Sequence, residues 1–125
     1  MIDKSFGEVF FDTGWCKNEF ISFRNKQYEI TVCARSYRET DLITDEQRFA
    51  FELFMENKSA LEKEIENMLI TYENEEFLGF LKPTDLVFER DGKYALLFDD
   101  ETDLDNGIAV ELAPDKEVMT QDDYL

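Results

Sequence analysis

The sequence predicts an α+β domain, in which a mainly antiparallel sheet carries a central pair of helices on one face. Strand-like apolar patterns occupy both ends of the chain, and two segments with helical periodicity lie together between them. The element order is therefore strands, two helices, strands. No internal repeat or linker divides the pattern, and 125 residues is the usual length of one domain. We expect residues 1–125 to form a single globular domain.

Three strands are predicted in the first forty residues. The aromatic run Phe6–Asp12 favours a first strand that ends at a Thr-Gly turn. Residues 19–24 and 27–34 then predict a hairpin about Asn25-Lys26, because a two-residue turn at this place sets apolar residues opposite one another.

The two cysteines are expected to be reduced. The hairpin register just described pairs Ile21 with Ile30, and it brings Cys16 near Arg35 rather than near Cys33. Two cysteines are too few for a disulfide scaffold, and no histidine accompanies them to complete a zinc site. The sequence thus predicts free thiols and no metal or cofactor site.

A first helix is predicted from about Asp45 to near Asn57. Thr44–Gln47 forms a capping box, in which the threonine hydroxyl accepts from the Gln47 amide and the Gln47 side chain reaches back. Asp45 and Glu46 favour the positive end of the helix. The apolar stripe is expected to comprise Phe49, Ala50, Leu53 and Phe54, widened by Phe51 and Met55.

A second helix, or a kinked continuation of the first, is predicted to end near residue 73. Ser59–Glu62 is a second capping box. The expected apolar stripe is Leu61, Ile65, Met68, Leu69 and Tyr72. The opposite, polar face carries Glu62, Lys63, Glu64, Glu66 and Asn67.

The C-terminal third predicts strands again. Asp91-Gly92 gives the strongest hairpin signal in the chain, because this pair tolerates the positive φ angles of a tight turn. The expected order is connecting chain 74–83, strand 86–89, turn 90–93, strand 94–98, acidic loop 99–106, strand 107–112 and a short edge piece at 118–119.

Negative charge is concentrated in the last two-thirds of the chain. The first forty residues contain six acids and six bases, so 24 of the 30 acids and the whole net charge of -17 lie after Thr40. A field of one sign attracts cationic surfaces and repels nucleic acid and anionic lipid. We therefore expect a basic protein partner, with no nucleic acid and no membrane.

A cytoplasmic location is expected from the absence of targeting signals. The N-terminus Met1–Lys4 has no basic start followed by an apolar run. No stretch approaches the ~18 consecutive apolar residues of a membrane helix.

The chain is not expected to be an enzyme. It contains no histidine, the usual general base. Carboxylate pairs can be drawn almost anywhere among 30 acids, so a carboxylate-dependent hydrolase ranks third among the functions considered. The acidic loop also fails the calcium-loop pattern, because Asn106 and Leu112 stand where glycine and glutamate are required. Weak cation binding at this loop is left open.

Four sequence motifs, taken in chain order, form a pattern that spans most of the chain. They are Trp15 before a hairpin; the run Ile43-Thr44-x-x-Gln47-x-x-Ala50-Phe51-x-x-Phe54-x-x-Asn57; Ile65, Ile70 and Tyr72; and Asp100-Glu101-x-x-x-x-x-Gly107-Ile108-Ala109-Val110-Glu111. In this order the chain resembles a large group of small bacterial domains of unknown function, several of which are found beside polymorphic toxins and regarded as immunity proteins. It departs from that pattern in a longer acidic turn, Asp99–Asn106, which has Leu104 but no tryptophan.

The resemblance implies a non-enzymatic inhibitor that covers the active site of a cognate toxin. The acidic charge agrees with a basic nuclease as that toxin. The alternative is a structural or regulatory interaction module without a toxin, for which a homodimer is left open. The acids expected to contact the partner are Asp99, Asp100, Glu101, Asp103, Asp105, Glu62 and Glu66.

Overall fold

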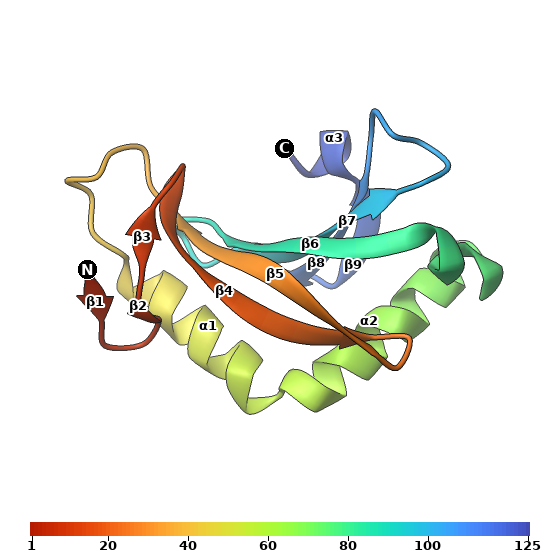
Figure 1. Ribbon diagram of the computed structural model, residues 1–125, viewed down its shortest axis with the longest axis horizontal. Coiled ribbons are helices and arrows are strands. Elements are labelled where there is room, and N and C mark those ends of the chain that lie inside the picture. Colours follow the sequence, from red (N-terminus) through yellow and green to blue (C-terminus); the bar gives the residue numbers. More distant parts are fainter.

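The computed structural model covers all 125 residues (Figure 1). Its strands are β1 (Ile2–Asp3), β2 (Gly7–Glu8), β3 (Phe10–Phe11), β4 (Gly14–Phe23), β5 (Lys26–Arg35), β6 (Leu81–Phe88), β7 (Tyr94–Asp100), β8 (Ile108–Ala113) and β9 (Glu117–Thr120). Its helices are α1 (Asp45–Glu56), α2 (Lys58–Tyr72), the short 3-10 helix η1 (Glu76–Phe80) and α3 (Gln121–Tyr124). None of them combines the length and the apolar character that crossing a bilayer requires.

Seven strands form one sheet in the order β3-β4-β5-β6-β7-β8-β9, so strands that are consecutive in the chain are also neighbours in space. Every neighbouring pair is antiparallel except β5 and β6, which are parallel because α1 and α2 form the crossover between them. Both helices cross one face of the sheet, and α3 lies on the other (Figure 1). The predicted α+β class is confirmed.

The start of α1 is fixed where the sequence predicts it. Thr44 and Gln47 form the expected capping box. Gln47 is fully buried, and its amide nitrogen donates 3.0 Å hydrogen bonds to the carbonyl oxygens of Arg35 and Phe88. These two residues end β5 and β6, so one buried amide ties the helix to both parallel strands.

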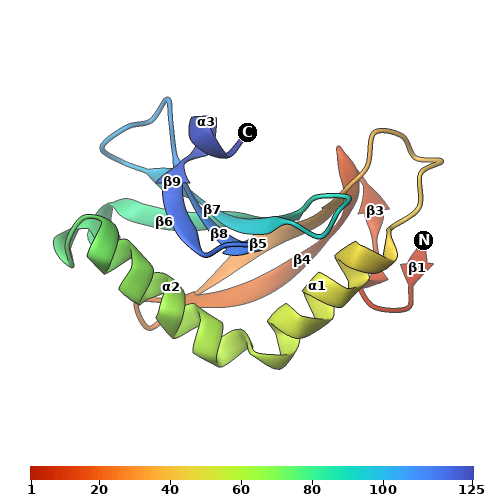
Figure 2. The same ribbon diagram turned by 180° about the vertical axis from the view of Figure 1, so that it is seen from behind.

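The apolar stripes of the helices are narrower than expected. On α1 the side chains of Ala50, Phe51 and Phe54 are buried, together with Gln47. Figure 2 shows that α1 and α2 meet at an angle. One flank of α1, which the predicted apolar stripe included, is therefore not covered by α2. Four side chains assigned to the stripes are exposed: Phe49, Leu53, Met55 and Tyr72.

The β4–β5 hairpin turns at Arg24-Asn25, one residue earlier than expected. Both residues have positive φ angles, 54° and 64°, as this turn type requires, and asparagine tolerates such angles better than lysine. The register moves by two residues, so Ile21 lies opposite Tyr28 rather than Ile30. A two-residue shift leaves every side chain on its expected face, so the apolar pattern cannot distinguish the two registers.

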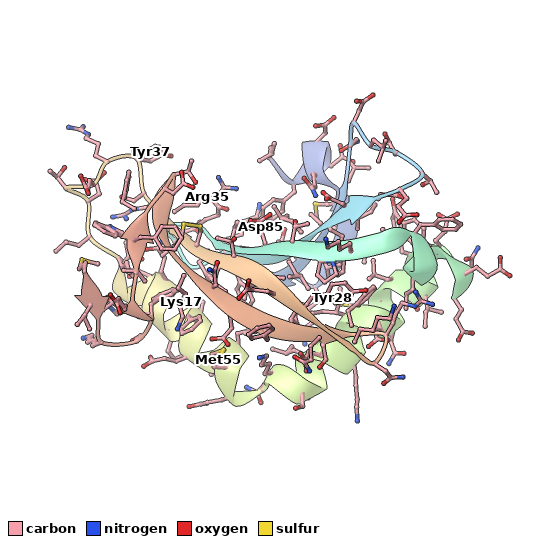
Figure 3. All side chains as sticks on the ribbon, viewed as in Figure 1. Lys17, Tyr28, Arg35, Tyr37, Met55 and Asp85 are labelled. Atoms are coloured by element: carbon pink, nitrogen blue, oxygen red, sulfur yellow. A yellow bond between two sulfur atoms is a disulfide. The ribbon has the colours of Figure 1, made fainter.

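Cys16 and Cys33 form a disulfide, which corrects the expectation of two free thiols. In the observed register they lie directly opposite each other, with Cα atoms 4.1 Å apart. Both are buried on the sheet face away from α1 and α2, and Figure 3 shows the bridge as a yellow bond near Arg35. Such a bridge is typical of proteins in oxidising compartments, and the cytoplasmic location expected from the sequence stays a prediction.

The second capping box is absent. Only Asn57 separates the helices, α2 begins at Lys58, and no side chain caps it, so the box expected at Ser59 was wrong. Glu62 instead accepts a 2.6 Å hydrogen bond from the backbone amide of Ser22. That amide lies on the outer edge of β4, and β3 pairs with β4 only near the start of β4. The Glu62 carboxylate therefore accepts from a backbone amide that no neighbouring strand pairs.

Three further differences concern the first strand, the start of β6 and the C-terminal residues. The expected first strand Phe6–Asp12 is divided into β2 and β3. β6 begins at Leu81 rather than Leu86 and passes Pro83 with an irregular register. The short helix α3 has no counterpart in the sequence prediction. The Asp91-Gly92 turn, β8 and the edge strand β9 lie where they were predicted.

Candidate functional site

Three adjoining hollows follow the side of α2 that faces β8 and β9. The first, the apolar groove, lies between α1, α2 and the β6–β7 and β8–β9 turns and has a volume of about 790 Å³. The last, the acidic hollow, lies between the end of α2, η1 and the loop 101–107 and has a volume of about 420 Å³. A middle hollow shares Glu64 and Lys116 with the first and Tyr72 with the last. We call the three together the α2 furrow; Figure 2 shows α2 and β9 side by side along it.

The floor of the apolar groove contains side chains that no other element covers. Phe49 and Leu53, on the uncovered flank of α1, are 64% and 41% exposed. Leu112, near the end of β8, and Pro114, in the β8–β9 turn, line the same groove. Single exposed apolar side chains are common on protein surfaces, but neighbouring ones in a concavity are typical of binding sites.

Tyr94 places a hydroxyl group at this floor. Its ring stacks on Phe88 at a centroid distance of 4.7 Å and packs edge-on against Phe54, so packing fixes its direction. Burial, and then the negative charge of Glu64, raise the pKa of the Tyr94 hydroxyl to about 12. A tyrosine hydroxyl is already protonated at neutral pH, and the raised pKa keeps this one protonated at alkaline pH as well, so it can donate a hydrogen bond in the groove.

Two carboxylates at one end of the apolar groove have no basic partner. Glu46, in the first turn of α1, packs against the β6–β7 turn so closely that a Cβ added to Gly92 would lie 3.3 Å from the Glu46 Cβ. Asp91 precedes that glycine and lines the same groove. Neither Glu46 nor Asp91 belongs to any of the ion pairs of the structure.

The two lysines that line the apolar groove are both engaged. Lys116 Nζ lies 2.9 Å from a carboxylate oxygen of Glu64. Lys93 Nζ lies 3.8 Å from Glu111 and 4.6 Å from the ring centroid of Tyr124, both on the opposite face of the sheet. The uncompensated charge at the groove is therefore negative.

The acidic hollow is lined by carboxylates and aromatic rings, with no lysine or arginine among them. Its acids are Glu73, Glu76, Asp100 and Asp103. The rings of Tyr72 and Phe80 are 44% and 45% exposed. One base, Arg24, lines a neighbouring hollow beside Glu76 without forming an ion pair. Carboxylates next to exposed rings favour lysine and arginine side chains, which are attracted by both.

The acids predicted from the sequence do not form one patch. Asp99, Glu101, Asp103 and Asp105 are exposed in or beside the loop. Asp100 is only 6% exposed, and its Oδ1 accepts hydrogen bonds from the amide and hydroxyl of Thr102, so it shapes the loop. Glu62 is bonded to the Ser22 amide, and neither Glu62 nor Glu66 lines the furrow.

Sequence reasoning missed the residues that meet the loop. Glu73 and Glu76 belong to an acidic segment at the end of α2, and only the fold brings them beside Asp103. The run of acids from Glu73 to Glu76, next to Phe77, was the available signal. No group of three or more His, Cys, Asp or Glu side chains in the structure is placed to hold a metal ion.

Comparison with known proteins assigns no family to the chain. No family model, curated protein or solved structure matches it. The surface just described is therefore the basis on which function is argued.

Proposed function

We propose that this domain is a non-enzymatic binding protein for a basic protein, and that the acidic hollow receives it. The observation that carries the proposal is the composition of that hollow, which combines the carboxylates of Glu73, Glu76 and Asp103 with two half-exposed rings and contains no base. The net charge of -17 supports the proposal, because a negative electrostatic field speeds association with a cationic partner and disfavours the binding of nucleic acid.

The resemblance noted above suggests a more specific form of this proposal. The partner would be a toxin, such as a basic nuclease, and the domain would neutralise it by covering its active site. The exposed carboxylates of Asp103 and Asp105 are suited to this role, since acids on an inhibitor can take the positions of substrate phosphates.

A second copy of the chain is the weaker candidate for the partner. Each copy carries a net charge of -17, so electrostatic repulsion opposes self-association. The acidic hollow would also need a basic surface on the other copy. Lys17 and Arg35, two bases of the N-terminal hairpin, are already paired with Glu19 and Glu89.

The experiment is to capture the partner on the immobilised domain from an extract of the source organism and to follow association by surface plasmon resonance. We expect a basic protein whose association rate falls steeply between ~50 and 500 mM salt, because exposed charges are screened over about 10 Å at 0.1 M. The double variant Glu73→Gln/Asp103→Asn should associate several-fold more slowly at low salt.

A matched control removes the same charge elsewhere. Glu29 and Glu39 are exposed and lie outside the furrow, so Glu29→Gln/Glu39→Gln should change the rate less. A partner whose association ignores salt and both double variants would refute the proposal. For the toxin form, an equimolar amount of the domain must abolish the activity of the captured protein; full residual activity would eliminate that form alone.

A further inference from the structure

The apolar groove has no role in the function proposed above. An acidic hollow alone is enough to attract a basic partner, yet Phe49 and Leu53 stay exposed in a concavity of about 790 Å³ at the other end of α2. Exposed rings and aliphatic side chains cost solubility, so a groove of this size is typical of a surface that is covered in a complex. The question is what covers it.

Charge complementarity identifies the occupant. The unpaired groups at the apolar groove are the carboxylates of Glu46 and Asp91, and those of the acidic hollow are again carboxylates. These carboxylates repel a second copy of the chain, which has a net charge of -17, at both the apolar groove and the acidic hollow. They repel an anionic lipid surface for the same reason. An apolar side chain accompanied by lysine or arginine is complementary to both.

We propose that the α2 furrow binds a single extended segment of a basic protein, with an apolar side chain in the apolar groove and lysine or arginine side chains in the acidic hollow. This inference rests on the proposed function and adds the chemical character and the direction of the bound segment. The apolar part lies at the start of α2, against Phe49 and Leu53. The cationic part lies at its end, between Glu73, Asp103 and the ring of Tyr72.

The length of α2 sets the distance between the two parts. α2 lines both the apolar groove and the acidic hollow, and it contains fifteen residues, which corresponds to a length of about 22 Å at 1.5 Å per residue. An extended segment covers that distance in about six or seven residues. The apolar anchor and the cations of the partner should therefore be separated by a spacer of about six residues.

Lys116 lies where the apolar groove meets the middle hollow, and it is paired with Glu64. A cationic segment passing along the furrow comes near this ammonium group. Removing Lys116 leaves the Glu64 carboxylate free for the partner, so Lys116→Gln should strengthen binding of such a segment. A merely structural role of Lys116 does not predict this gain.

The probe is a synthetic fluorescent peptide with a leucine-rich end and an arginine-rich end, joined by a spacer of about six residues. Fluorescence anisotropy should show binding at least about tenfold tighter than that of either half alone, because linking raises the effective concentration of the second end. A peptide with a spacer of about two residues, which reaches only ~7 Å, should lose this advantage.

Variants of the domain then assign the two ends. Phe49→Ser/Leu53→Ser should weaken the linked peptide about tenfold and leave the arginine-rich half unchanged, since only apolar burial is lost. Glu73→Gln/Asp103→Asn should weaken both peptides. Phe20→Ser is the matched control, because Phe20 is 52% exposed outside the furrow and its loss should change neither affinity.

The outcomes separate the inference from the proposed function. The furrow inference is overturned if the linked peptide binds no more tightly than its arginine-rich half, or if Phe49→Ser/Leu53→Ser leaves the affinity of the linked peptide unchanged. The proposed function is kept in that case if the affinity of the peptides still depends on Glu73 and Asp103. If neither peptide depends on Glu73 and Asp103, both are overturned. A several-fold gain with Lys116→Gln supports the path along α2, and a loss contradicts it.

Discussion

Removal of the Cys16–Cys33 bridge should lower the unfolding midpoint of the domain by about 12 °C. The bridge joins β4 and β5 on the face away from the helices, at a sequence separation of 17. In the folded state, reduction leaves the backbone hydrogen bonds between β4 and β5 in place. In the unfolded state, reduction opens the loop that the disulfide closes, so the unfolded chain gains conformational entropy. The loss of stability therefore arises mainly from the unfolded state.

The magnitude follows from the loop length. In the chain-entropy model a loop of this size restricts the unfolded chain by about 11 cal/mol/K, equivalent to about 3 kcal/mol at 25 °C. A domain of 125 residues unfolds with an entropy of about 260 cal/mol/K near its midpoint. Dividing the free energy of about 3 kcal/mol by this unfolding entropy gives the shift of about 12 °C.

Differential scanning calorimetry with and without a phosphine reductant measures this shift. The control is Cys16→Ala/Cys33→Ala, whose midpoint should not respond to the reductant, because the chain has no other cysteine. A shift below about 3 °C after complete reduction would contradict the chain-entropy estimate. Two titratable thiols in protein refolded in air would refute the observed register of β4 and β5.

Three other predictions concern contacts that hold the fold. Gln47→Leu should lower the free energy of unfolding in urea by about 3 kcal/mol, since the carbonyls of Arg35 and Phe88 lose the Gln47 amide as a donor, and a loss under about 1 kcal/mol would contradict this. Burial alone raises the pKa of Asp3, but hydrogen bonds from Arg48 and from two backbone amides lower it below its ordinary value of 3.8. The ionised Asp3 therefore stabilises the fold above pH 3.8 and loses this effect as the pH falls through the folded pKa. The difference in free energy of unfolding between wild type and Asp3→Asn should shrink below pH 3.8. A difference that stays constant would contradict this prediction. Glu62→Ala should cost about 1 kcal/mol and speed hydrogen exchange at the Ser22 amide, and unchanged exchange there would show that Glu62 does not protect the edge of β4.

Elements determined by neighbouring residues were predictable. The capping box of Thr44 and Gln47 needs only four consecutive residues, and it marks the start of α1 correctly. The Asp91-Gly92 turn needs only one glycine at positive φ, which is 94° at Gly92. In both cases the backbone geometry follows from local hydrogen bonding or local sterics.

Features that depend on the arrangement of distant elements were not predictable. The alternation of side chains in β4 and β5 specifies their faces but not a register shifted by two, so the pairing of Cys16 with Cys33 was missed. The exposure of Phe49 follows from the angle between α1 and α2, which periodicity does not encode. The acidic hollow needs the end of α2 beside the loop that contains Asp103, and this proximity is a property of the whole fold.

Binding of a basic partner along α2 is tested most directly by NMR titration of the isotope-labelled domain with the captured partner. We predict that the amide signals of Phe49, Glu64, Glu73 and Asp103 shift, since these residues line the furrow from end to end. Asp85, which Figure 3 places on the opposite face of the sheet, should be unaffected. Shifts concentrated around Asp85 and the β4–β5 hairpin, with none along α2, would contradict the proposed site.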